Sequence, residues 1–125
     1  MTQESMLFVA ALLTFAVGLA HSVLGERFVL MRLFRRTELP KLFGETAFTA
    51  RTLRFAWHLT TLAWWGIGAM LVLASRGLLS TGNTLRVIAF TMAVTALTIL
   101  VASRGRHLAW PVFLAIGLLS LWAAD

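Results

Sequence analysis

Four long apolar stretches occupy most of this 125-residue chain and constrain its fold more than any other feature. They lie at about residues 6–24, 55–74, 85–102 and 108–124, and a helix needs about 20 apolar residues to cross a bilayer. A soluble core could not bury so much apolar surface, because 59% of the residues are hydrophobic and only 13% are charged. The sequence therefore predicts an all-α fold, an integral membrane four-helix bundle of up-down topology that forms one domain.

The connections between these stretches differ in length and charge. Residues 75–83 (SRGLLSTGN) and 103–107 (SRGRH) contain Gly, Ser and Asn and are typical of turns. The first connection is longer and basic. Residues 26–36 predict a short helix there, with arginines on one side of a helical wheel and leucines on another. We expect this helix to be interfacial and to lie in the headgroup layer after the first span.

Lys and Arg are distributed unequally between the two ends of the predicted bundle. One end carries Arg76 and Arg86, and the other carries the remaining nine of the 11 basic residues. These nine are Arg27, Arg32, Arg35, Arg36, Lys41, Arg51, Arg54, Arg104 and Arg106. Basic residues concentrate on the cytoplasmic side of membrane proteins. The sequence therefore predicts cytoplasmic first and third connections and extracytoplasmic termini. Since orientation accounts for the net charge of +6, we expect the lipid bilayer as a partner and no nucleic acid.

Small and hydroxyl-bearing residues recur at helical spacing along three of the stretches. Thr14 and Gly18 lie on one face of the first stretch, and Thr91, Thr95 and Thr98 form a stripe on the third. Such residues allow membrane helices to approach closely. We therefore expect both faces to contact a neighbouring helix.

Three histidines, His21, His58 and His107, lie on three different stretches near the predicted cytoplasmic face. The small and polar residues beside His21 and His58 predict that both rings point into the bundle. A buried imidazole without a partner is unfavourable, so the sequence predicts that the three histidines converge at one depth. We expect His21 and His58 to form the closest pair.

Several interpretations of this histidine layer remain open. The three histidines could bind a first-row metal ion together with Glu26. Two of them could instead bind haem b, with its propionates paired to Arg51, Arg54 or Arg104. The same Arg and His side chains could bind an anionic lipid headgroup or phosphate. Finally, each histidine could simply hydrogen-bond to a neighbour while Glu26 pairs with a nearby arginine.

Several classes of function lack support in the sequence. No charged residue lies in the middle of any stretch, although proton-coupled transporters and ion pathways normally need one. Cysteine is absent, and no Ser-His-Asp set, Gly-rich phosphate loop or HExxH motif occurs. The favoured function is a small binding or accessory protein, with a membrane protein partner or a second copy of the chain as further partners. The alternatives are a membrane-embedded metal-dependent enzyme and a structural subunit without a ligand.

Two segments also resemble a known family. The residues AHSVLGER, followed by RTLRFAWHLTTLAWWG, are similar to a family of small bacterial four-span inner-membrane proteins with an AHSxLGER-type motif. The similarity covers most of the chain, from Leu12 to about Trp110. It implies a bacterial inner-membrane location and a multi-pass topology, and it transfers no catalytic residue.

Overall fold

The computed structural model describes all 125 residues, and its regular structure is entirely helical. The first helix, α1 (Gln3–Leu24), continues through a π-helix, η1 (Gly25–Leu30), into α2 (Met31–Leu33), so that one helical segment of 31 residues runs from Gln3 to Leu33. The remaining helices are α3 (Thr46–Ser75), α4 (Thr81–Ala102) and α5 (Ala109–Trp122). The all-α prediction is therefore confirmed.

Three helical segments are long and apolar enough to cross a membrane, namely Gln3–Leu33, Thr46–Ser75 and Thr81–Ala102. They contain the first three predicted stretches. The fourth stretch forms α5, which has 14 residues and is shorter than the predicted span at 108–124. At 1.5 Å per residue α5 is about 21 Å long, which is less than the roughly 30 Å of a bilayer core.

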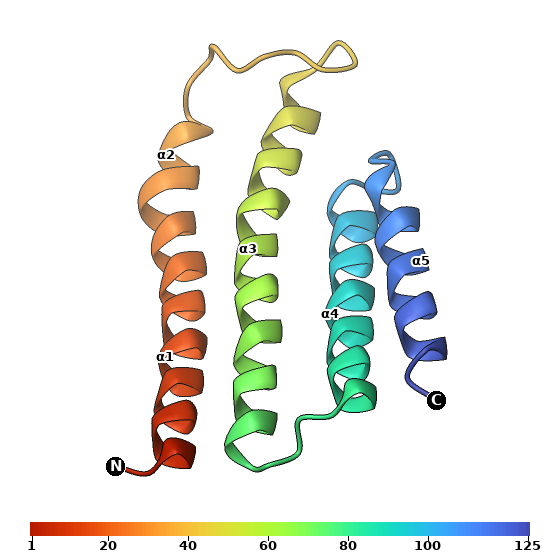
Figure 1. Cartoon of the computed structure of the whole chain (residues 1–125). Helices are drawn as coiled ribbons and strands as arrows, with labels where there is room; N and C mark the ends of the chain where they lie inside the picture. Colours follow the sequence, from red (N-terminus) through yellow and green to blue (C-terminus); the bar gives the residue numbers. More distant parts are fainter.

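The helices pack in chain order, as Figure 1 shows. The α1 helix packs on α3, α3 packs on α4, and α4 packs on α5. The backbones of α1 and α4 do not approach each other, and neither do those of α3 and α5. The four helices therefore form a row of neighbours, whereas a closed four-helix bundle would surround one common core.

The prediction of a short separate helix at residues 26–36 is wrong, because these residues continue the helix of α1 up to Leu33. Gly25 does not break the helix, since its backbone has the ordinary helical angles φ −61° and ψ −47°. The continuation also packs on α3, and Leu30 within it is only 2% exposed. Packing against α3 therefore holds this segment in line with α1, although its arginines suggested a surface helix.

Small residues allow the close helix contacts. Gly18 is buried, and a Cβ atom there would lie 2.6 Å from Trp65 Nε1, so the prediction that Gly18 faces a neighbour is confirmed. Thr91 packs against Gly66 of α3, as its stripe predicted. The hydroxyls of Thr14 and Thr91 donate within their own helices, to the carbonyl oxygens of Ala10 and Val87, each at 2.8 Å. The small residues thus set how closely α1, α3 and α4 approach.

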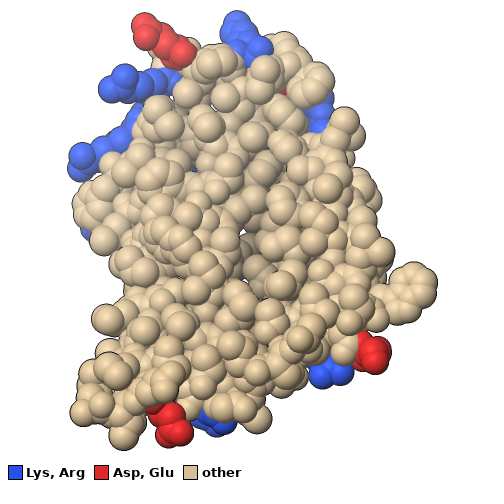
Figure 2. All heavy atoms as spheres, in the orientation of Figure 1, with Lys and Arg blue, Asp and Glu red and all other residues tan.

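Charged side chains gather at the two ends of the molecule. On the face shown in Figure 2, Lys and Arg side chains are most numerous around the end that holds the α2–α3 connection, and a broad middle band shows no charged side chain. The α4–α5 connection lies at this same end, because Arg106 Nη1 contacts Glu45 Oε1 at 3.1 Å. We call this end, with the connections at residues 34–45 and 103–108, the basic end.

Candidate functional site at the basic end

A chain of hydrogen bonds links α1, η1 and α3 inside the helical part of the molecule, next to the basic end. Ser22 Oγ lies 2.7 Å from Thr61 Oγ1 and 2.9 Å from His58 Nδ1. The other ring nitrogen, His58 Nε2, lies 3.3 Å from Glu26 Oε2. Glu26 Oε1 pairs with Arg54 Nη2 at 3.0 Å, which agrees with the last of the open interpretations, in which Glu26 pairs with a nearby arginine. We call these five residues the polar chain.

The directions of these hydrogen bonds follow from the donors available. Thr61 donates its single hydroxyl hydrogen to the Gly18 carbonyl oxygen at 3.1 Å, so the Ser22 hydroxyl donates to Thr61. Ser22 Oγ then accepts from His58 Nδ1–H. His58 Nε2 faces the Glu26 carboxylate, whose Oε2 atom lies 3.3 Å away.

The order hydroxyl, imidazole, carboxylate in this chain is also that of a hydrolase triad. Two features make Ser22 a poor nucleophile. Its hydroxyl hydrogen is used by Thr61. Ser22 also lies inside α1, where backbone N–H groups are used by the helix and none is free to stabilise an oxyanion. The polar chain is therefore better suited to joining α1 to α3 than to acyl transfer.

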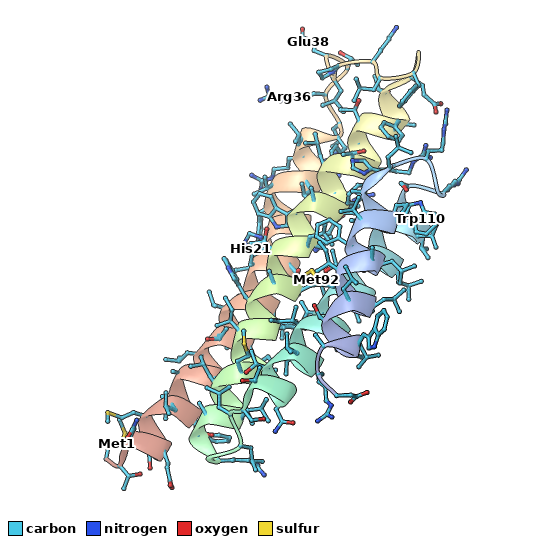
Figure 3. The ribbon with its side chains drawn as sticks, turned by 45° about the vertical axis from the view of Figure 1, so that its right-hand side comes forward. Met1, His21, Arg36, Glu38, Met92 and Trp110 are labelled. Carbon is cyan, nitrogen blue, oxygen red and sulfur yellow. The ribbon has the colours of Figure 1, made fainter.

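His21 faces a different side of α1 from Ser22. Its ring stacks on Trp57, with the ring centroids 4.6 Å apart and the planes within 2° of each other, and Trp64 lies at 5.0 Å. Trp57 Nε1–H donates to the His21 carbonyl oxygen at 3.1 Å, while His21 Nε2 is buried without a hydrogen-bond partner. Gly25 provides the space for this arrangement, since a Cβ atom there would overlap the Trp57 indole. Figure 3 shows His21 about midway along the α1–α2 segment.

His107 lies in a third environment, at the start of α5. Its ring is perpendicular to that of Phe55, with 5.3 Å between the centroids, and roughly parallel to that of Phe48 at 6.4 Å. Its Nδ1 atom accepts a hydrogen bond from the Ala109 backbone N–H at 3.3 Å. His107 therefore helps to begin α5 and packs the α4–α5 connection against α3.

The predicted convergence of three histidines is therefore wrong. Only His58 and Glu26 meet, and no group of three or more His, Cys, Asp or Glu residues is placed where it could hold a metal ion. The predicted ligand set His21, His58, His107 and Glu26 does not come together. The physical reason is that adjacent residues on a helix point about 100° apart. The α1–α3 register turns Ser22 toward His58 and leaves His21 on Trp57.

The arginines predicted to pair with haem propionates have other positions. Arg54 pairs with Glu26, and Arg51 Nη2 lies 3.8 Å from Glu45 Oε1. Arg104 lies in the turn between α4 and α5, with a left-handed φ of 53°, and makes no ion pair. Two of the three arginines are thus already paired with carboxylates on neighbouring segments.

Four other arginines near the basic end have no carboxylate partner, namely Arg27, Arg32, Arg35 and Arg36. The guanidinium groups of Arg27 and Arg32 lie over the Phe28 ring, 5.6 Å and 5.8 Å from its centroid. Arg32 and Arg36 line a groove of about 440 Å³ together with Val29 and Leu33. In Figure 3, Arg36 lies in the connection that follows α2, at the basic end. We call this groove the arginine groove.

Sequence reasoning left the hydrogen-bond network as one of four interpretations, did not identify Ser22 as its link to His58, and missed the arginine groove. One signal for the polar chain is present, because Ser22 and Glu26 are four residues apart and so are Arg54 and His58. Residues at this spacing share a helix face. Two such faces meet here.

The chain was also compared with models of protein families, with curated proteins and with solved structures. None of the three comparisons finds a match, so the functional assignment rests on the geometry of the chain itself.

Proposed function

We propose that the chain is a small multi-pass protein of a bacterial inner membrane that binds an anionic phospholipid headgroup in its arginine groove. In this arrangement the basic end faces the cytoplasm and both termini lie outside. Support for the location comes from three helical segments of sufficient length and apolarity and from the concentration of Lys and Arg at one end. The proposed role is that of a binding or accessory protein.

The observation that carries the proposal is the unpaired state of Arg32 and Arg36. Two of the three acidic residues near this end are used elsewhere, because Glu26 contacts Arg54 and His58, and Glu45 contacts Arg51 and Arg106. The third, Glu38, lies in the connection after α2 and makes no ion pair with Arg32 or Arg36. Arg32 and Arg36 have no such partner, and Val29 and Leu33 place apolar surface beside them.

This combination matches the chemistry of a phospholipid at the membrane surface. A guanidinium group can bind a phosphate through two parallel hydrogen bonds. The apolar floor of the groove can contact the first carbons of an acyl chain. A basic residue near an anionic bilayer contributes about 1 kcal/mol to binding, so two residues acting together would give an affinity difference of about 30-fold.

Native mass spectrometry in neutral detergent can test this proposal with phosphatidylglycerol as the probe. The variant Arg32→Gln/Arg36→Gln should lose about 30-fold in affinity, since two contributions of about 1 kcal/mol are removed. The matched control Arg35→Gln/Arg104→Gln removes the same charge from the same end but leaves the arginine groove intact. It should lose less than about threefold, since these charges lie outside the groove.

Equal losses in the two double variants would show general charge attraction without a site. Unchanged binding in both would place the lipid outside the arginine groove, and absence of binding to the wild type would favour a structural subunit without a ligand. An absorbance spectrum and a metal analysis of the same sample address the remaining alternatives. A Soret band would support haem, and stoichiometric metal would support the metal-dependent enzyme.

A further inference from the structure

A second groove, of about 580 Å³, lies between α1, α3 and α4, far along the molecule from the arginine groove. It exists because α1 and α4 both pack on α3 without approaching each other. Figure 2 shows the molecule hollowed near the middle of the face where these helices meet. We call this feature the central groove.

The floor and one wall of the central groove are held in place. Gly66 and Thr91 form the floor where α3 meets α4, and a Cβ atom on Gly66 would lie 2.7 Å from Thr91 Oγ1. Trp65 forms a wall, and its Nε1–H donates to the Phe15 carbonyl oxygen at 3.2 Å. The Phe15 and Trp65 rings also contact each other, with their centroids 6.4 Å apart. A wall fixed in this way does not collapse into the groove.

The size of the central groove limits its occupant. Its volume of about 580 Å³ lies within the range of small-molecule sites, about 300–1,000 Å³. Along α4 the groove reaches from Arg86 to Val94, or about 12 Å at 1.5 Å per residue. This length can hold the part of a fatty-acid chain that lies next to its carboxylate, and the rest of the chain would extend beyond the groove.

The positive charge of Arg86 at one end of the groove favours a ligand with a negatively charged polar end. Every lining residue between Phe90 and Val94 is apolar or Thr91, whereas the other end is lined by Arg86. The guanidinium of Arg86 contacts Asp125 Oδ1 at 3.3 Å, but these side chains are 54% and 78% exposed. Exposed ion pairs of this kind contribute little to stability. Arg86 can therefore exchange Asp125 for the carboxylate of a ligand.

We infer that the central groove binds a long-chain fatty acid, with its hydrocarbon chain along Trp65 and Phe90 and its carboxylate on Arg86. One slender groove with one guanidinium matches one chain with one negative charge. The inference depends on the proposed membrane location, which brings fatty acids to the groove. It does not depend on headgroup binding in the arginine groove.

Trp65 provides a direct readout, because bromine atoms quench tryptophan fluorescence at short range. We would titrate 9,10-dibromostearate into the full-length protein in neutral detergent and follow the saturable part of the quenching. Ala69→Phe fills the central groove and should abolish that part. Arg86→Gln should weaken binding about tenfold, as expected for loss of a charge-assisted hydrogen bond.

The controls are matched in chemistry and position. Ala63→Phe adds the same bulk to α3 at an exposed position outside the groove, and Arg76→Gln removes the only other basic residue of that end. Both variants should keep wild-type quenching, and so should Arg32→Gln/Arg36→Gln. Circular dichroism confirms that each variant is folded.

Three results would overturn the inference. Saturable quenching that survives in Ala69→Phe would place the fatty acid elsewhere. Equal binding of the methyl ester of dibromostearate, or unchanged binding in Arg86→Gln, would remove the role of Arg86. A dimer that dissociates in Ala69→Phe, without saturable quenching in the wild type, would identify a second copy of the chain as the occupant.

Discussion

Replacing Gly18 with alanine should weaken the contact between α1 and α3. A Cβ atom at this position would lie 2.6 Å from Trp65 Nε1, 2.9 Å from Trp65 Cδ1 and 3.3 Å from Thr61 Cγ2. The indole is rigid, and its Nε1–H is bonded to the Phe15 carbonyl oxygen at 3.2 Å. The ring therefore cannot move away without loss of that hydrogen bond.

The expected change in the free energy of unfolding combines three terms. Loss of the Trp65 hydrogen bond costs about 0.5–1.5 kcal/mol, and overpacking costs about 1–3 kcal/mol. Alanine is favoured over glycine in a helix by about 1 kcal/mol, which offsets part of this. The net destabilisation of Gly18→Ala should therefore be about 1–3 kcal/mol. Gly18→Leu should cost more, since a larger side chain meets the same ring.

Unfolding in mixed micelles with increasing dodecyl sulfate, followed by circular dichroism, measures this change. Ala16→Leu is the matched control, because Ala16 lies on the same helix and is exposed. It should change the free energy of unfolding by less than about 0.5 kcal/mol. If Gly18→Ala proved as stable as the wild type, the close contact between Gly18 and Trp65 would be refuted.

Three further predictions concern topology and the α1–α3 contact. Reporters fused after the last residue should be extracytoplasmic and reporters within residues 37–43 cytoplasmic, because of the uneven basic charge; a cytoplasmic C-terminus would reverse the proposed orientation. Ser22→Ala and Thr61→Val should each destabilise the fold by about 1 kcal/mol, and the double variant should lose less than the sum since the two share one hydrogen bond; strictly additive losses would contradict that bond. Gly25→Ala should be strongly destabilising in the wild type but much less so in Trp57→Leu, because the indole that occupies the space is gone; equal losses in both backgrounds would argue against the Gly25–Trp57 contact.

The long helices and the Gly18 contact could be predicted from the sequence because they depend on local properties. Apolar length marks the helices, and glycine marks a close approach. The continuation of α1 to Leu33 was missed because the arginines of that segment suggested a surface helix. Arginine is nevertheless a good helix former, and burial of Leu30 against α3 decides the outcome.

The arrangement around the histidines could not be predicted because it depends on the register between two helices. His21 and Ser22 are adjacent in the sequence, so a small change of register would exchange the side chain that faces His58. The register is set by the contacts of Trp57 with Gly25 and of Trp65 with Gly18. The open row of helices was also beyond prediction. Without a hydrophobic force between helices in lipid, closure depends on individual contacts, and α5 packs on α4 alone.

The short length of α5 has a consequence for the surrounding membrane. In a bilayer, the segment Gln3–Leu33 with 31 residues and α5 with 14 residues would meet lipid at opposite ends of the row of helices. Lipids adapt to a short hydrophobic helix by thinning locally, and long helices adapt by tilting. The bilayer would therefore vary in thickness around the protein and would be thinnest beside α5. The exposed ring of Trp122, the last residue of α5, would lie at the edge of this thin region.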